Sequence, residues 1–172
     1  MTAERTETQP AQFLEIEIEP GLSLRKVTPQ DSEVMFVLID KNTAHLSQFG
    51  DNTAEKYPTL ESVRQRNTHE FPNEHRFGIW DQGIFVGFVK VTKGSSEMFE
   101  IGYWQGEEFC GKGYMTKAVI ALTQYAVDSL GAKVLFGRVA KENAASIKVL
   151  ERADYVSSEE TQNNKYFIFK SK

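Results

Sequence analysis

Two glycines flank a lysine in the segment Phe109-Cys110-Gly111-Lys112-Gly113-Tyr114, which joins a predicted strand to the start of a predicted helix. Glycine at these positions lets successive backbone N–H groups turn into one concave space, and the positive end of the helix dipole adds to their field. The combination is typical of an anion site, and it best suits a phosphate or pyrophosphate. An ordinary surface turn is the alternative that these six residues leave open.

Two well-known phosphate-binding loops do not fit this spacing. The nucleotide P-loop requires Gly-x-x-x-x-Gly-Lys-Ser/Thr, which the segment lacks. The dinucleotide fingerprint requires Gly-x-Gly-x-x-Gly, but Thr116 stands where the third glycine should be, and the preceding strand belongs to a predicted antiparallel meander. A third kind of phosphate-binding loop binds coenzyme A, and this spacing does not exclude it.

The elements around the loop follow from the spacing of apolar residues. Alternation predicts strands at 75–80, 84–92 and 97–104, joined by tight turns into an antiparallel meander. Helical spacing then predicts a helix over 114–130, capped by Gly131, and an apolar strand follows at 133–140. The apolar face of this helix consists of Met115, Val119, Leu122, Ala126 and Leu130. The strand before the helix and the strand after it should therefore be parallel neighbours.

The remaining segments complete a mixed α/β (α+β) fold. Strands are predicted at 14–19, 22–27, 155–157 and 165–170, and helices at 28–39, 57–67 and 143–153. Thr28 can cap the first of these helices, with Pro29 at its first position. The order of elements is neither all-antiparallel nor doubly wound. Residues 1–12 are polar and are expected to form a disordered tail, and residues 13–172 are expected to form a single domain.

Composition narrows the function classes. The length of 172 residues predicts one domain, and the net charge of -4 speaks against a large DNA-binding face. The single cysteine excludes an internal disulfide, and the three histidines share no metal-ligand spacing. No apolar run approaches a membrane span of about 18 residues, and the polar start lacks the pattern of a signal peptide. We expect a cytoplasmic, metal-free protein with no nucleic-acid or membrane partner.

Three segments together resemble the GCN5-related N-acetyltransferase (GNAT) superfamily. They are Glu100-Ile101-Gly102-Tyr103-Trp104, Gly111-Lys112-Gly113-Tyr114-Met115-Thr116-Lys117-Ala118 and Asn143-Ala144-Ala145-Ser146-Ile147-Lys148-Val149-Leu150-Glu151. Within the superfamily they are similar to the RimJ/RimL branch, known for ribosomal-protein N-terminal acetylation, as is Leu24-Arg25-Lys26-Val27-Thr28-Pro29-Gln30-Asp31. The resemblance implies a GNAT fold, in which a mixed, mostly antiparallel central sheet is splayed at a parallel strand pair and flanked by about four helices.

The resemblance also implies how the co-substrate acetyl-CoA binds. The strand that ends at Tyr103-Trp104 parts from its parallel neighbour, and the pantetheine arm pairs with backbone in the gap as an added strand would. The pyrophosphate lies on backbone N–H groups of the glycine loop, and Asn143 hydrogen-bonds the pantetheine arm. The expected coenzyme-binding residues are Tyr103, Trp104, Cys110, Gly111, Lys112, Gly113, Tyr114, Met115, Asn143 and Ser146.

Transfer of acetyl from a thioester to an amine requires a neutral amine, a donor for the developing oxyanion and a proton for the leaving thiolate. Glu100 is the predicted base, directly or through water, and the resemblance implies Ser146 as the acid. A backbone N–H near Tyr103 is the expected oxyanion donor, and we expect direct transfer without an acyl-enzyme or a metal. Structural roles stay open: a solvated strand carboxylate for Glu100, a helix-end hydrogen bond for Ser146 and an N-cap for Asn143.

The sequence departs from the family pattern in four places. Cys110 stands where the family usually has Arg or Gln. Leu150 replaces a tyrosine that is catalytic in many relatives, which moves the acid role to Ser146 or to water. Asp154-Tyr155 replaces the usual Gly-Phe, and this change has no explanation in the sequence. Residues 47–52 replace an aromatic, proline-containing loop that usually helps to form the acceptor site.

Three functions are consistent with these observations. The first is an acetyl-CoA-dependent acetyltransferase that modifies a protein or peptide N-terminus, as the branch resemblance implies. The second is the same reaction on a small amine such as an antibiotic, a polyamine or an aminoacyl conjugate, which the altered loop at 47–52 favours. The third is a non-catalytic acetyl-CoA-binding module, which the changes at Cys110 and Leu150 suggest. A homodimer is left open.

Overall fold

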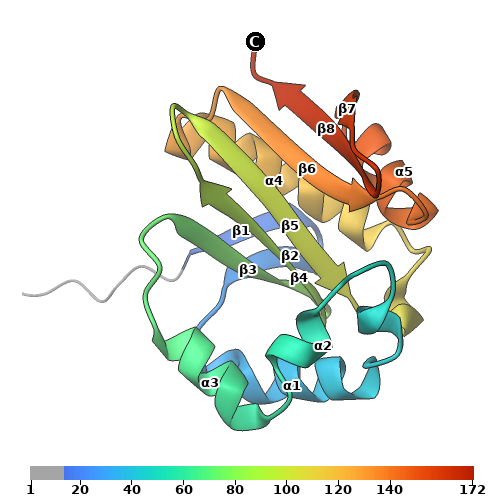
Figure 1. Cartoon of the computed structure of the whole chain (residues 1–172). Coiled ribbons are helices and arrows are strands. Elements are labelled where there is room, and N and C mark those ends of the chain that lie inside the picture. Colours follow the sequence, from blue (N-terminus) through green and yellow to red (C-terminus); the bar gives the residue numbers. More distant parts are fainter. Residues whose placement is uncertain (1–13) are drawn as a thin grey trace, which may run out of the picture.

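The computed structural model describes residues 14–172 of the chain, so the tail expected over residues 1–12 lies outside the described residues. These residues form an eight-stranded sheet in the order β1-β2-β3-β4-β5-β6-β8-β7 (Figure 1). Every pair of neighbours in this sheet is antiparallel except β5 and β6, which are parallel. The predicted mixed, mostly antiparallel sheet with one parallel pair is confirmed.

The element bounds follow the predicted order. The strands are β1 (Glu15–Glu19), β2 (Leu22–Lys26), β3 (Glu74–Asp81), β4 (Ile84–Lys93), β5 (Met98–Gln105), β6 (Val134–Ala140), β7 (Val156–Glu160) and β8 (Asn164–Lys170). The helices are α1 (Ser32–Lys41), α2 (Thr53–Lys56), α3 (Leu60–Thr68), α4 (Tyr114–Leu130) and α5 (Ala144–Arg152). The single turn of α2 was not predicted from the sequence, because four residues are too few to show a helical period.

Local sequence signals explain where the helices begin and end. Thr28 and Asp31 form a capping box over a short 3-10 turn that leads into α1, with Pro29 at the first position as predicted. Gly131 ends α4 in the left-handed conformation with φ 70°, which glycine adopts without steric cost. Asn143 caps α5 because its side chain accepts a hydrogen bond from the Ser146 amide.

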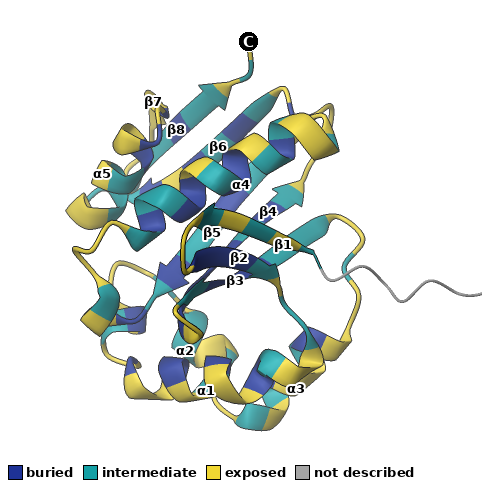
Figure 2. Cartoon of the chain, turned by 180° about the vertical axis from the view of Figure 1, so that it is seen from behind, coloured by how far each residue is buried: buried dark blue, intermediate teal, exposed yellow. Residues whose placement is uncertain are grey.

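One face of the sheet packs on α4 and α5. Figure 2 shows α4 crossing this face, with its buried residues toward the strands and its exposed residues outward. The predicted apolar face is buried except for Leu130, which is partly exposed at the last turn. The buried residues that α4 contributes are Met115, Ala118, Val119, Leu122, Thr123 and Ala126.

The opposite face of the sheet packs on α1 and α3. Met35, Leu38 and Ile39 of α1 and Val63 of α3 form a second core with aromatic residues of the sheet. Phe88 and Trp104 stack in this core with ring centroids 6.0 Å apart. The sheet is therefore covered on both faces, and the two groups of helices approach β5 from opposite sides.

The structure explains the Asp154-Tyr155 pair that follows α5. Asp154 takes a left-handed conformation with φ 63°, which aspartate tolerates better than most residues. The Tyr155 ring is buried, and its hydroxyl lies 2.7 Å from Thr123 Oγ1 on α4. Aspartate therefore takes over the turn that glycine usually makes, and the buried phenol finds a polar partner.

Leu150 is a core residue of α5 that packs closely on β6. It is fully buried, and a Cβ added at Gly137 of β6 would lie 2.9 Å from Leu150 Cδ1. We predict that Leu150→Ala lowers the free energy of unfolding by about 2–5 kcal/mol, measured by urea denaturation. Val156→Ala is the control, since Val156 is 66% exposed and should change stability by less than about 0.5 kcal/mol. Equal losses in the two variants would contradict this packing.

Candidate functional site

The parallel strands β5 and β6 pair over only three residues before they part. The paired residues are Met98 with Val134, Phe99 with Leu135 and Glu100 with Phe136. Beyond them β5 continues to Gln105 on β4, and β6 continues to Ala140 on β8, so each strand keeps its outer partner while the inner edges separate (Figure 1). The predicted splay at the parallel pair is confirmed.

A cleft of about 720 Å³ opens where the strands part. Its walls come from β5, β6, the start of α5, the loop after α1 and the turn between β7 and β8. The charged residues that line it are Asp51, Glu100, Arg138 and Glu142. Three carboxylates against one guanidinium make the lining acidic, which favours a cationic ligand such as an amine.

Tyr103 reaches from β5 to the first turn of α5. Its hydroxyl lies 2.8 Å from Ser146 Oγ and 3.2 Å from the Ser146 carbonyl oxygen, to which it donates. Burial raises the pKa of Tyr103 to about 12, against a smaller lowering by the hydrogen bond with Ser146, so the phenol stays neutral at physiological pH. The sequence pointed to Tyr103 for its backbone alone; the contact of its side chain with Ser146 has no signal in residue spacing.

Glu100 and Tyr103 lie on opposite faces of β5. Alternation along the strand places Glu100 and Trp104 toward α1 and α3, whereas Ile101 and Tyr103 face α4 and α5. The cleft nevertheless exposes both Glu100 and Ser146, because the sheet is open at this point. A ligand between the strands would therefore have a carboxylate on one side and a hydroxyl on the other.

The glycine loop presents free backbone amides at the start of α4. Gly111 and Gly113 have φ of 78° and 82°, and an added Cβ would meet no atom within 4 Å at either position. Among the described residues, the amides of 111–116 make no backbone hydrogen bond, and the first bond of the helix runs from the Lys117 amide to the Gly113 carbonyl. The Cys110 amide is already bonded to the Glu107 carbonyl, so the free amides begin at Gly111.

Contacts from three elements hold this loop in place. The Tyr114 hydroxyl donates to Asp81 at the end of β3, and Lys117 forms an ion pair with Glu19 at 2.6 Å. On the other side of the loop, the Glu107 amide donates to Asn42 Oδ1 at 2.8 Å. The free amides are thus fixed relative to the cleft before any anion binds, which lowers the entropic cost of binding.

The remaining predicted coenzyme-binding residues differ in what they can offer. Trp104 and Met115 lie in the two cores and are almost fully buried, so only their backbone can contact a ligand. Lys112 is exposed, and its ammonium lies 5.6 Å from the centre of the Phe109 ring. Asn143 uses its side-chain oxygen as the N-cap of α5, and the residue lines the cleft.

The loop after α1 contributes Gln48, Phe49, Gly50 and Asp51 to the lining of the cleft. Phe49 and Gly50 both have positive φ, at 55° and 74°, and the Phe49 side chain is 49% exposed at the mouth of the cleft. An exposed aromatic residue in a strained conformation is unusual outside binding sites. This loop lines the cleft together with the Asn163–Asn164 turn. The sequence pointed to residues 47–52 as a part of the acceptor site, whereas the Asn163–Asn164 turn did not stand out.

Within residues 14–172, no three His, Cys, Asp or Glu side chains gather as the ligands of a metal ion would. No helix in the same range combines the length and the apolar character needed to cross a bilayer.

A family model described as "Acetyltransferase (GNAT) domain" matches residues 22–156 of the chain. The chain belongs to the GNAT acetyltransferase family. As a member it is an acetyl-CoA-dependent N-acetyltransferase, and the predicted fold, enzyme class and co-substrate agree with this assignment.

Individual GNAT proteins resemble the chain over most of its length. It is 30% identical over 142 residues to "Probable N-acetyltransferase YjcK" of Bacillus subtilis (strain 168), covering 77% of this chain and 78% of that protein. The structure of RimL, the ribosomal L7/L12 α-N-protein acetyltransferase, in complex with coenzyme A has a TM-score of 0.83 at 18% identity and covers 91% and 98% of the two chains. The ribosomal-protein-S5-alanine acetyltransferase of Vibrio fischeri has a TM-score of 0.81 at 19% identity and covers 91% and 96%.

Cys110 provides a probe of the loop because it is the only cysteine of the chain. Partial burial of the thiol, together with the carboxylates of Glu107 and Glu108, raises the pKa of Cys110 and outweighs the hydrogen bond from Gln105. We predict that the thiol reacts with iodoacetamide more slowly than free cysteine at pH 7, because less thiolate is present. Labelling rates measured as a function of pH check this prediction. A rate at pH 7 equal to that of free cysteine would contradict it.

Proposed function

We propose that this GNAT enzyme transfers acetyl from acetyl-CoA to the α-amino group of a protein N-terminus. The observation that carries the proposal is the cleft between β5 and β6, which offers Glu100 on one wall and Ser146 on the other. An acyl transfer needs a proton acceptor on the side of the amine and a proton donor on the side of the thiol. Glu100 of β5 and Ser146 of α5 supply these groups separately.

The coenzyme occupies the open end of the parallel pair. The pantetheine arm lies along the free inner edge of β5 and pairs with its backbone as a further strand would. Its diphosphate rests on the free amides at 111–114, where the positive end of the α4 dipole adds to their attraction. The side-chain amide of Asn143 binds the pantetheine arm from the other wall.

Glu100 receives the proton of the acceptor amine, directly or through one water. An α-amino group has a pKa of about 7.7–8.0, so a large fraction is already neutral near pH 7.5, whereas a lysine amine with a pKa of about 10.4 is almost fully protonated. The half-buried carboxylate of Glu100 is matched to the easier of these two tasks. A backbone N–H near Tyr103 on the open edge of β5 stabilises the oxyanion that forms when the amine attacks.

Ser146 donates a proton to the departing thiolate, and Tyr103 positions it. When the neutral phenol turns its single hydrogen from the Ser146 carbonyl oxygen to Ser146 Oγ, the serine hydroxyl hydrogen is free to point into the cleft. Tyr103 of β5 therefore brings a phenol next to Ser146. In many relatives the tyrosine comes instead from the position that Leu150 occupies here. The new C–N bond forms on the thioester carbon, the C–S bond then breaks, and the acetyl group passes directly to the amine without an acyl-enzyme.

Two further features support a protein N-terminus as the acceptor. The acidic lining of the cleft attracts a protonated amine, which must lose its proton only on arrival. Structural neighbours with the same fold include the L7/L12 and S5 acetyltransferases described above, although their identity to this chain is below 20%. The altered loop that carries Phe49 favours the second candidate, a small-molecule amine.

An assay of acetyl-CoA consumption with a mixed acceptor panel tests the proposal. The panel contains N-terminal peptides with free α-amines, the same peptides with blocked α-amines but a free lysine, and small amines. We expect turnover with the free α-amines and little with the other two groups. Turnover confined to small amines would replace the proposal with its alternative, and tight acetyl-CoA binding without any turnover would leave a binding module.

The glycine loop gives a prediction with a matched control. We predict that Gly111→Phe weakens acetyl-CoA binding at least about tenfold in calorimetry, because the side chain occupies the space in front of the amides. Gly131→Phe imposes the same left-handed strain of about 1–2 kcal/mol at the far end of α4, where an added Cβ also meets nothing. Similar losses of unfolding free energy but different affinities are expected. Unchanged affinity in Gly111→Phe would contradict the phosphate site.

Ser146 and Tyr103 give a second prediction about the same cleft. Ser146→Ala should lower kcat about 10²–10⁴-fold and change KM for acetyl-CoA much less, since the lost hydroxyl acts in proton transfer. Tyr103→Phe keeps the ring and should lower kcat by a smaller factor. Steady-state kinetics check both variants, with Ser158→Ala on the exposed strand β7 as the control. Native kcat in Ser146→Ala would remove this residue from the reaction.

A further inference from the structure

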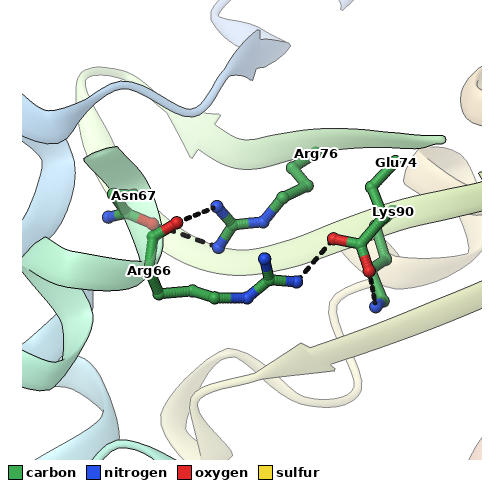
Figure 3. Close-up of polar contacts among 5 residues, drawn as sticks. All are labelled: Arg66, Asn67, Glu74, Arg76 and Lys90. Atoms are coloured by element: carbon green, nitrogen blue, oxygen red, sulfur yellow. Dashed lines mark hydrogen bonds and ion pairs between the residues drawn. The ribbon is translucent and has the colours of Figure 1, made fainter. Parts of the chain in front are cut away.

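A cluster of charged side chains lies on the face of the sheet that carries Glu100. It consists of Arg66, Asn67, Glu74, Arg76 and Lys90, and we call it the basic cluster (Figure 3). Glu74 accepts from Arg66 Nη2 at 2.5 Å and from Lys90 Nζ at 2.9 Å. Arg76 Nη2 donates to Asn67 Oδ1 at 3.0 Å, and the Arg66 guanidinium stacks on the Phe71 ring. These contacts hold three cationic groups close together.

The basic cluster has more donors and positive charge than its own acceptors can satisfy. Arg66 and Lys90 both bond to Glu74, whereas Arg76 donates to Asn67 Oδ1 and to the Arg66 carbonyl oxygen. The five residues therefore hold three positive charges and one negative charge, a surplus of two. Arg66 Nη1 and Arg76 Nε are buried without an acceptor among the described residues, and in Figure 3 the free Arg66 nitrogen is turned toward the Arg76 guanidinium. Burial, followed by the nearby Arg66 charge, lowers the pKa of Arg76. A cluster with this imbalance favours an anion.

The register of the sheet places Lys90 beside the reacting centre. Lys90 of β4 lies opposite Gly102 of β5, and Thr92 lies opposite Glu100. Glu100 and Lys90 are therefore diagonal neighbours on one face, and such residues have Cα atoms about 7–8 Å apart. Gly102 lines the cleft and has no side chain to cover Lys90, whose Cε would lie 3.6 Å from a Cβ at that position.

The outer members of the basic cluster are accessible to a ligand. The side chains of Lys90 and Arg66 are 32% and 21% exposed, whereas Glu74 between them is 14% exposed. A carboxylate that approaches over Gly102 can therefore reach Lys90 first and then Arg66. Glu74 holds both cations by charged hydrogen bonds, which keeps their donors in fixed positions.

We propose that the basic cluster binds a carboxylate of the acceptor, so that the preferred substrate is an N-terminus with Asp or Glu as its second residue. The inference rests on the proposed function, since it takes Glu100 as the place where the amine reacts. When the N-terminal amine of an extended peptide lies at Glu100, the side-chain carboxylate of its second residue can reach Lys90. The acidic cleft then attracts the N-terminal amine of the peptide, and the basic cluster attracts the carboxylate of its second residue. These two attractions fix the direction in which the peptide binds.

Paired peptides that differ only in Glu or Gln at the second residue test this inference. We expect kcat/KM to be about tenfold higher for the Glu peptide, and we expect Lys90→Met to abolish the difference while leaving KM for acetyl-CoA unchanged. Lys93→Met is the matched control, because Lys93 is on the same strand but points to the other face. This control should keep the tenfold preference.

Calorimetry of the same peptides with the enzyme saturated by coenzyme A gives a readout that does not depend on turnover. We expect the Glu peptide to bind about tenfold more tightly than the Gln peptide, and we expect Lys90→Met to remove this margin. Equal affinities in the native enzyme, or a preference that persists in Lys90→Met, would overturn the inference even if peptides are acetylated. A preference in binding without acetylation would support the basic cluster and contradict the proposed function instead.

Discussion

The separation of β5 from β6 after three residue pairs is the constraint on which the rest of the site depends. Backbone donors and acceptors at an open edge are normally paired, so such an edge inside a sheet favours a ligand that pairs with it. Each strand keeps its outer neighbour along its length, and the two cores hold the sheet from both faces. The opening is therefore built into the fold and exists before the coenzyme binds.

Two kinds of physical information made the fold predictable from sequence. Period-two and helical spacing gave the order of strands and helices, and the β-α-β unit gave the parallel pair. The two-glycine loop indicated an anion site, which stays a prediction, and the amides at 111–116 are free of backbone hydrogen bonds. The contact of Tyr103 with Ser146 and the basic cluster depend on side chains from distant segments, such as α3 with β4, and no local pattern encodes such contacts.

The departures from the family pattern are easier to understand in three dimensions. Leu150 packs against Gly137 at the lining of the cleft and carries no group that could transfer a proton. A phenol is still present beside Ser146, but it comes from Tyr103 on the opposite wall of the cleft. Asp154 and Tyr155 preserve the end of α5 by another route. For Cys110, which forms no charged contact that could replace Arg or Gln, the structure offers no compensation.

Hydrogen exchange of backbone amides with and without acetyl-CoA tests the central claim most directly. If the thioester lies between the parting strands, acetyl-CoA should slow exchange at residues 101–105 of β5 and at the loop amides 111–116, and leave the β1–β2 hairpin unchanged. Protection confined to other segments, such as the groove between β1 and α4, would contradict the account. Unchanged exchange at the open edge of β5 despite saturating acetyl-CoA would contradict it equally.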